Sequence, residues 1–255
     1  TVIDRAFLFE HKAKEKIDFG VIFSDEKNHA SIVDGIRLSR AERVVYEHCN
    51  MEDLDRKMKP YRNRRKLIVS DAVFSVDGDV APLNGLVALK ERYGALLMLD
   101  EAHSFGTLGT KGKGIAEYYG VDPRAIDINM GTLSKALGSV GGYIAGSKAL
   151  IDFVRAAASP FVLTAGPMAP ALALGAAKAV DIIDSRPEIV ERLRYNVSYV
   201  KKGLDALGIP YRSHSQIIMI PVGDEEKLVS MSHDLKEQGV LVSGMRWPAA
   251  PWGDS

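Results

Sequence analysis

Short apolar runs alternate with helical patterns along the N-terminal part of the chain, and this alternation constrains the fold more than any other feature. The apolar runs lie at 20–24, 43–46, 66–73 and 95–100, and the helical patterns at 30–40, 51–58 and 83–93. Strands that alternate with helices are typical of a mostly parallel sheet covered by helices. The pattern therefore predicts an α/β protein.

The same reading continues to the end of the chain. It predicts strands at 126–130 and 142–145, and helices at 170–183, 187–207 and 225–238. Two further strands are expected at 216–221 and 240–242, which would make the C-terminal part a smaller α/β unit. Asp184-Ser185-Arg186-Pro187 breaks one helix and starts the next. We therefore expect an N-terminal segment at 1–20, a large domain at 21–185 and part of a small domain at 186–255.

Charge and cysteine content narrow the function classes. The 255 residues carry 33 basic and 33 acidic side chains, so no excess charge favours nucleic acid or an anionic membrane as a partner. No apolar run is long enough for a membrane span, and residues 1–20 lack the apolar centre of a signal peptide. The single cysteine, Cys49, suits a reducing cytoplasm and is interpreted as an apolar filler. No metal site is expected.

A lysine follows the strand predicted at 126–130, in the run Gly131-Thr132-Leu133-Ser134-Lys135. Its amine is offered to a carbonyl group, and the neighbouring hydroxyls to an anion. Burial beside other cationic groups would lower the pKa of Lys135 enough to make it a nucleophile. The run therefore fits a cofactor aldehyde, although a solvated surface lysine is the ordinary alternative.

The strand predicted at 95–100 ends in Asp100-Glu101-Ala102-His103. Asp100 could keep the ring nitrogen of a pyridine cofactor protonated, and His103 could bond the phenolic oxygen of the same ring. The letters DEAH also suggest a helicase, but the phosphate loop G-x-x-x-x-G-K-[ST] which that reading requires does not occur in the sequence. A strand end capped by charged residues is the structural alternative.

A third candidate is His29, between a predicted strand and a helix that Asn28 or Ser31 could cap. Its imidazole could stack on a flat ring, or it could be a histidine with no ligand. The other histidines lie in no recognisable motif and are interpreted as surface or internally satisfied side chains: His11, His48, His214 and His233.

Taken together and in this order, these segments resemble the α-oxoamine synthase family of fold-type I, pyridoxal 5'-phosphate (PLP)-dependent enzymes. The stretches that carry the resemblance are SDEKNHASIVDGIRLS, DAVFSVDGDVAPL, LMLDEAHSFGTLGTKGKG, GTLSKALGSVGGYIAG and SPFVLTAGPMAP. Each stretch is weak alone, but their order and spacing are specific. They cover nearly everything from Val21 to the end of the chain.

The resemblance implies a role for each matching residue. Lys135 matches the lysine that carries PLP as a Schiff base, and Asp100 the partner of the pyridine nitrogen. The remaining cofactor-binding matches are His29 on the ring face, His103 and Ser75 near the phenolic oxygen, Thr132 at the phosphate, and Thr164 at the phosphate of a neighbouring subunit. A homodimer with shared active sites is implied.

The implied reaction is the decarboxylative condensation of a small amino acid (alanine, glycine or serine) with an acyl thioester of coenzyme A or a carrier protein. Lys135 would remove the α-proton, and His103 would steady the developing oxygen charge. Two alternatives stay open. One is another fold-type I enzyme, such as an aminotransferase or an aldolase-like lyase, and the other is a non-catalytic partner subunit.

The chain also departs from the family, whose members are considerably longer. Residues 1–19 contain no glycine turn of the kind that cradles the cofactor phosphate. The last residues, 244–255, match a stretch that leads toward a carboxylate-binding arginine, but the chain stops before it. We therefore expect this sequence to be part of a longer enzyme, with further chain between residues 1–19 and Val21.

Overall fold

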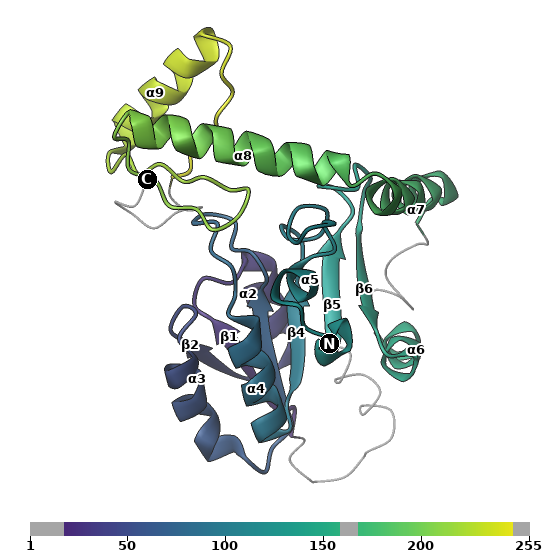
Figure 1. Ribbon diagram of the computed structural model, residues 1–255. Helices are drawn as coiled ribbons and strands as arrows, with labels where there is room; N and C mark the ends of the chain where they lie inside the picture. The colour runs from purple at the N-terminus through teal and green to yellow at the C-terminus, as the bar shows by residue number, and fades with distance from the viewer. Residues whose placement is uncertain (1–17, 159–167, 247–255) are drawn as a thin grey trace. The chain divides into compact units, whose positions relative to one another are not determined.

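The computed structural model describes residues 18–158 and 168–246 of the chain. Six strands form one sheet in the order β2-β1-β3-β4-β5-β6 (Figure 1). Their bounds are β1 Val21–Asp25, β2 Glu42–Tyr46, β3 Lys66–Asp71, β4 Leu96–Asp100, β5 Ile128–Thr132 and β6 Gly142–Gly146. Neighbouring strands are parallel except β5 and β6, which are antiparallel. The predicted mostly parallel sheet is confirmed.

The helices connect these strands and continue beyond them. Their bounds are α2 Ala30–Ser39, α3 Met51–Met58, α4 Leu83–Tyr93, α5 Ile115–Tyr119, α6 Lys148–Ala157, α7 Pro170–Ser185, α8 Glu188–Ala206 and α9 Glu225–Glu237. Two short 3-10 turns lie at Lys59–Tyr61 and Pro123–Ala125. The sequence reading did not predict α5 or α6. None of the helices in the described part of the chain is long and apolar enough to cross a membrane.

The central strands β1, β3 and β4 are buried on both faces of the sheet. Alternate residues of a strand point to opposite faces, so each face has its own set of buried side chains. On one face, Ile32 and Ile36 of α2 pack with Val69 of β3. On the opposite face, Phe23 of β1 and Leu97 of β4 are fully buried. Helices α3 and α4 lie side by side, and they contact β2 and β4 respectively (Figure 1). Burial of both faces explains the continuous apolar runs that the sequence shows in its strands.

The chain divides into two compact units: Thr1–Phe74 with Val80–Arg192, and Ser75–Asp79 with Leu193–Ser255. The first unit contains the sheet. In the second unit, Arg212 pairs with Asp77 at 3.3 Å, and His214 Nδ1 lies 2.9 Å from Asp79 Oδ1. These ion pairs join the segment 75–79 to the C-terminal residues of the same unit. The domain boundaries expected from the sequence stay a prediction.

Two strands predicted for the C-terminal part are not formed. Within 216–221 only Met219 takes part in a bridge, an isolated antiparallel one with Arg212. Residues 240–242 have no strand partner in the described part of the chain, and the side chain of Leu241 is 85% exposed. An apolar run becomes a strand only where another strand accepts its hydrogen bonds, and a sequence pattern does not supply that partner.

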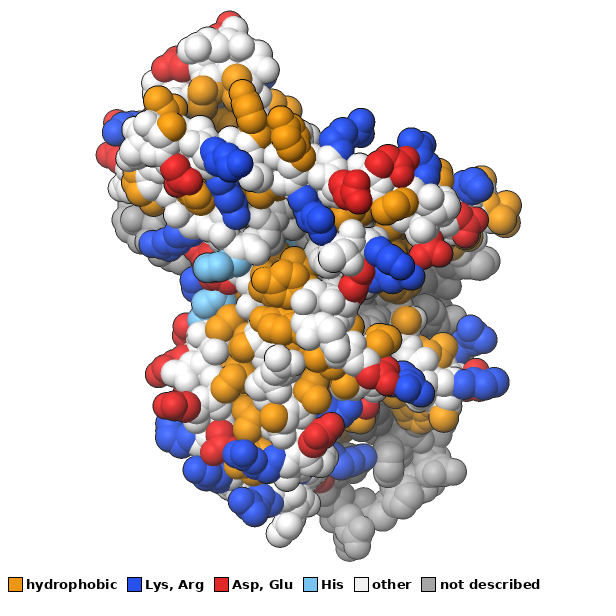
Figure 2. All heavy atoms as spheres, viewed as in Figure 1, with side chains coloured by type: hydrophobic (Ala, Val, Ile, Leu, Met, Phe, Trp, Pro, Cys, Tyr) orange, Lys and Arg blue, Asp and Glu red, His pale blue; other side chains and the backbone are white. Residues whose placement is uncertain are grey.

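Basic and acidic side chains are interspersed over the face of the molecule drawn in Figure 2. On this face, Lys and Arg side chains lie close to Asp and Glu side chains.

Candidate active site at the carboxyl ends of the strands

Polar side chains gather where the parallel strands end. Asp71 ends β3, Asp100 ends β4 and Thr132 ends β5. Asp71 and Asp100 are register partners on neighbouring strands, and both are buried. The carboxyl ends of parallel strands share one edge of the sheet, which is where ligands bind in open α/β folds. This edge is therefore the candidate active site.

Asp100 is held in one orientation by its own turn. Its Oδ1 accepts a hydrogen bond from Ala102 N at 2.8 Å, and the residue is 4% exposed. Burial raises the pKa of Asp100, while the hydrogen bond from Ala102 and the positive charges of Lys135 and His29 act in the opposite direction. A cationic group bound at Asp100 would offset the cost of burying its charge.

Lys135 and His103 meet directly, with Nζ and Nε2 2.8 Å apart. Burial lowers the pKa of Lys135, although the negative charges of Asp100 and Asp71 oppose that shift. Burial, followed by the charge of Lys135, also lowers the pKa of His103, to about 4. His103 is therefore neutral at physiological pH, and one of its ring nitrogens faces the lysine amine. The structure thus brings together Lys135, His103 and Asp100, which the motifs had singled out separately.

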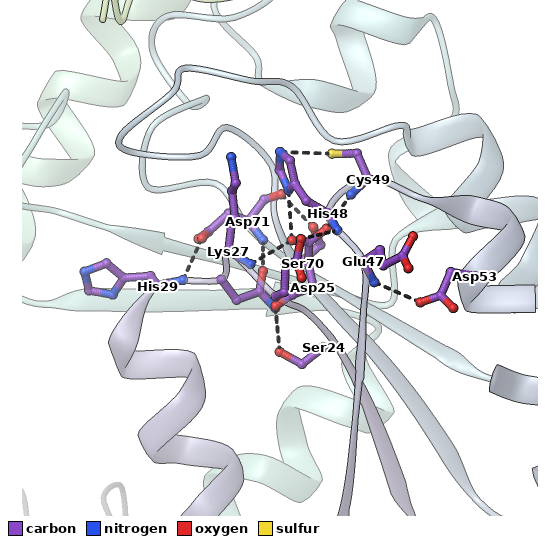
Figure 3. Close-up of polar contacts among 12 residues, drawn as sticks. Ser24, Asp25, Lys27, His29, Glu47, His48, Cys49, Asp53, Ser70 and Asp71 are labelled. Atoms are coloured by element: carbon purple, nitrogen blue, oxygen red, sulfur yellow. Dashed lines mark hydrogen bonds and ion pairs between the residues drawn. The ribbon is translucent and has the colours of Figure 1, made fainter. Parts of the chain in front are cut away.

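His29 is itself the N-cap of α2, a role that the sequence reading gave to Asn28 or Ser31. Its Nδ1 accepts a hydrogen bond from Ser31 N at 3.3 Å and lies 2.8 Å from Ser31 Oγ. The backbone N of His29 donates to Asp71 Oδ2 at 2.8 Å (Figure 3). The cap and this hydrogen bond fix the exposed imidazole beside the edge of the sheet.

Asn28 ties this turn to β3 and has a different role from the cap expected of it. Its Nδ2 donates to Val69 O at 2.9 Å and to Ser24 Oγ at 3.0 Å, while its Oδ1 accepts from Asp71 N at 2.9 Å. Asn28 is buried, so these hydrogen bonds replace those that water would make. It therefore positions both His29 and Asp71.

Thr132 begins the tight turn that carries Lys135. Its Oγ1 lies 2.8 Å from Ser134 Oγ and accepts from Ser134 N at 3.3 Å. The turn closes where Leu133 N donates to Gly141 O, and Gly141 has a φ of 107° that a side chain would rarely adopt. The hydroxyls of Thr132 and Ser134 therefore stand together, as a phosphate-binding turn requires.

The cofactor-binding and catalytic roles of all the predicted site residues stay predictions, and two of these residues cannot be placed beside the others. Ser75 belongs to the second compact unit, and Thr164 lies outside the described residues. Glu101, next to Asp100, does not belong to the site: it is buried and accepts hydrogen bonds from Ser104 Oγ and from Ile115 N at 3.2 Å. Its role is to hold the loop that follows β4.

Sequence reasoning missed Asp71, although this residue opens the stretch DAVFSVDGDVAPL that supported the family resemblance. Burial raises the pKa of Asp71 to about 7, and the negative charge of Asp100 adds to the effect. A titratable group with a strongly perturbed pKa at the edge of a site is a functional candidate. The sequence feature that could have indicated Asp71 is its position near the end of the apolar run at 66–73.

Comparison with known proteins identifies the family of the chain. The family model for aminotransferase class I and II matches residues 15–253. The chain therefore belongs to the aminotransferase class I and II family. Within that family, the resemblance to α-oxoamine synthases is confirmed by the relatives that the chain matches.

Among those relatives, 8-amino-7-oxononanoate synthase of Thermosipho melanesiensis is 43% identical over 91% of this chain and 59% of its own length. The Bacillus subtilis enzyme 8-amino-7-oxononanoate synthase 1 gives the same identity and the same coverage. This chain thus spans about three fifths of the length of these proteins.

Solved structures support the same assignment. Serine palmitoyltransferase from S. paucimobilis, with bound PLP-myriocin, has a TM-score of 0.85 and 32% identity over 92% of this chain and 60% of its own. The enzyme from Sphingomonas wittichii has a TM-score of 0.87 and 32% identity over 94% and 61%. 8-Amino-7-oxononanoate synthase from Francisella tularensis has a TM-score of 0.72 and 25% identity over 88% and 65%.

Proposed function

We propose that the protein containing this chain is a PLP-dependent α-oxoamine synthase, which condenses a small amino acid with an acyl thioester. The products would be an α-amino ketone, carbon dioxide and the free thiol of coenzyme A or a carrier protein. The observation that carries the proposal is the 2.8 Å approach of Lys135 Nζ to His103 Nε2, within the electrostatic influence of Asp100. The names of the relatives favour this reaction within the family.

The donor set fits PLP group by group. The cofactor has an aldehyde, a pyridine nitrogen, a phenolic oxygen and a phosphate. An amine is present at Lys135, a buried carboxylate at Asp100, a neutral imidazole at His103 and paired hydroxyls at Thr132 and Ser134. When bound, PLP supplies an electron sink that stabilises negative charge at the α-carbon of an amino acid.

The side chains of the site would carry out the proton transfers. A lysine with a lowered pKa releases its proton more readily, so Lys135 is suited to act as a nucleophile and afterwards to remove the α-proton as a base. His103 is neutral, so its ring N–H can donate a hydrogen bond to a developing oxygen anion. Their contact lets the proton that Lys135 gains be shared with His103.

Asp100 and His29 would hold the cofactor ring. The carboxylate of Asp100 favours a protonated pyridine nitrogen, which in turn compensates for the burial that raises the pKa of Asp100. The exposed imidazole of His29, fixed by the cap of α2 and by Asp71, is available to stack on a ring. The protein scaffold thus positions both groups before the cofactor binds.

The assembly and the remaining site residues belong to the same proposal. We propose a cytoplasmic homodimer in which Thr164 reaches the cofactor phosphate of the neighbouring subunit and Ser75 approaches the phenolic oxygen. The support is the match of both residues to the family motifs and the likeness of the chain to the enzymes named above.

The test is product analysis with the complete protein. Purified protein is incubated with PLP, with alanine, glycine or serine, and with a panel of acyl-coenzyme A and acyl carrier protein thioesters. We expect the acyl-dependent release of carbon dioxide and an α-amino ketone of matching mass. Amino-group transfer to a keto acid without carbon dioxide would instead indicate an aminotransferase. A protein that binds no PLP and cannot be fixed to it by borohydride at Lys135 would be a non-catalytic partner.

A further inference from the structure

Three side chains that the proposed reaction does not use meet at the ends of β1 and β2 (Figure 3). His48 Nδ1 lies 2.9 Å from Asp25 Oδ1, and His48 Nε2 lies 3.7 Å from Cys49 Sγ. The imidazole therefore stands between a carboxylate and a thiol. We name Asp25, His48 and Cys49 the thiol cluster.

Asp25 is held rigidly in the thiol cluster. The residue is 2% exposed, its Oδ1 accepts from Lys27 N at 2.9 Å, and its Oδ2 accepts from Cys49 N at 2.8 Å. These hydrogen bonds fix the carboxylate that binds Nδ1 of His48. A buried carboxylate on one ring nitrogen sets the direction of the other nitrogen, which here points to the sulfur.

The ring of His48 is also held by packing. Phe74 meets it edge to face, with ring centroids 4.5 Å apart and planes at 87°. Burial by itself lowers the pKa of His48, but the hydrogen bonds to Asp25 and Cys49 outweigh this effect and raise the pKa to about 10. His48 is therefore an imidazolium at neutral pH. Its positive charge therefore lies 3.7 Å from the sulfur of Cys49.

Cys49 lies beside the charged imidazole of His48 and is itself partly exposed to solvent. The residue is half-buried and its sulfur has a polar neighbour, so Cys49 is not the apolar filler that the sequence suggested. A nucleophile in contact with an imidazole that a third group orients is the arrangement of an activated cysteine. We propose that Cys49 is a reactive thiol, activated by His48 and Asp25, that forms a reversible mixed disulfide with low-molecular-weight disulfides.

The exchange is balanced in atoms and electrons. The thiolate of Cys49 attacks one sulfur of the small disulfide, a new S–S bond forms, and the original S–S bond breaks. The displaced half leaves as a thiolate and takes a proton from the imidazolium or from water. Cys49 is oxidised and the leaving half is reduced. The 255-residue chain has one cysteine, so no second thiol within it can displace the adduct.

The test uses oxidised glutathione with the folded chain at pH 7, followed by intact mass. We expect one glutathionyl group per chain, its removal by dithiothreitol, and no adduct on Cys49→Ser. His48→Gln should slow the reaction by about tenfold, because the charge beside the sulfur is lost. The matched control is His214→Gln, which removes another carboxylate-paired histidine and should leave the rate unchanged.

A second measurement needs no variant. With the same reagent at pH 7, the folded chain should react faster than the urea-unfolded chain, although the sulfur is half-buried. The proposal is overturned if the folded chain forms no adduct, if it reacts no faster than the unfolded chain, or if a folded His48→Gln variant reacts as fast as the wild type. Circular dichroism establishes that each variant is folded. The test is independent of PLP and of the proposed reaction.

Discussion

Asp71 and Asp100 are register partners at the carboxyl ends of β3 and β4, so two buried carboxyl groups stand side by side at the candidate active site. Two neighbouring carboxylates away from water do not both ionise easily. Burial and the charge of Asp100 raise the pKa of Asp71 to about 7. Asp71 consequently keeps its proton to a higher pH than an ordinary carboxyl group does.

Replacing Asp71 by Asn should stabilise the PLP-free chain at high pH. A carboxyl group whose pKa is higher in the folded state binds its proton more tightly there, so the wild type loses stability as the pH rises from about 4 to about 7. Asn carries no charge, and its side-chain oxygen can still accept from His29 N. The gain should be close to zero near pH 4 and about 4 kcal/mol at pH 8, since each pKa unit corresponds to about 1.4 kcal/mol. Urea unfolding at both pH values measures it, and a gain independent of pH would contradict the assignment.

Replacing Lys135 by Ala should abolish borohydride-dependent attachment of PLP and lower turnover by about 10²–10⁴-fold or more, because both the nucleophile and the base are lost. The matched control is Lys148→Ala. Lys148 is an exposed lysine of α6 that pairs with Asp152, and its removal should leave turnover unchanged. Retention of PLP attachment in Lys135→Ala would assign the cofactor to another lysine.

Replacing Asn28 by Ala should destabilise the chain by about 2–4 kcal/mol, because Val69 O and Asp71 N lose their buried partner. Asn50→Ala is a matched control. It removes the N-cap of α3, whose Oδ1 accepts from Glu52 N and Asp53 N, and should cost about 1 kcal/mol. Urea unfolding compares the two variants, and equal losses would mean that the Asn28 bridge adds nothing beyond an ordinary cap.

Replacing Gly106 by Ala should displace the turn that carries Lys135. A Cβ at Gly106 would lie 2.5 Å from Ala136 Cβ, and Gly106 has a φ of 81°. We expect a loss of about 2–4 kcal/mol, with reduced turnover because Ala136 adjoins Lys135. Gly94→Ala, at a φ of 59° and with nothing within 4 Å, should cost only about 1 kcal/mol and leave turnover unchanged. Equal effects of the two variants would show that the loop around Gly106 can move to accommodate the added methyl group without loss of stability.

Much of the sheet was predictable because the central strands β1, β3 and β4 are largely buried, and each appears in the sequence as a short apolar run between turn residues. The six strands of the sheet end within two residues of their predicted positions. The prediction of two strands in the C-terminal part was wrong. The runs at 216–221 and 240–242 are short, and no sequence pattern indicates whether a partner strand exists. Helix α5 escaped prediction because its five residues are too few for a periodic pattern.

Part of the candidate site could likewise be predicted from the sequence, and part could not. The motifs around Lys135, Asp100, His103 and His29 were visible because each follows a strand and has a reactive side chain. The roles of Asp71 and of the thiol cluster could not be predicted from the sequence, because they depend on contacts with residues that are distant in sequence. Asp71 is 42 residues from His29, and His48 is 23 residues from Asp25.

The amino-acid sequence by itself determined the order of strands and helices and the family motifs, because periodicity and turn residues act locally. Only the tertiary structure decided that Asp71 lies beside Asp100 on the neighbouring strand and that Lys135 contacts His103. It also decided that His48 lies between Asp25 and Cys49. The physical reason is that strand register and burial set distances and pKa values, and both arise only when separate segments of the chain pack together.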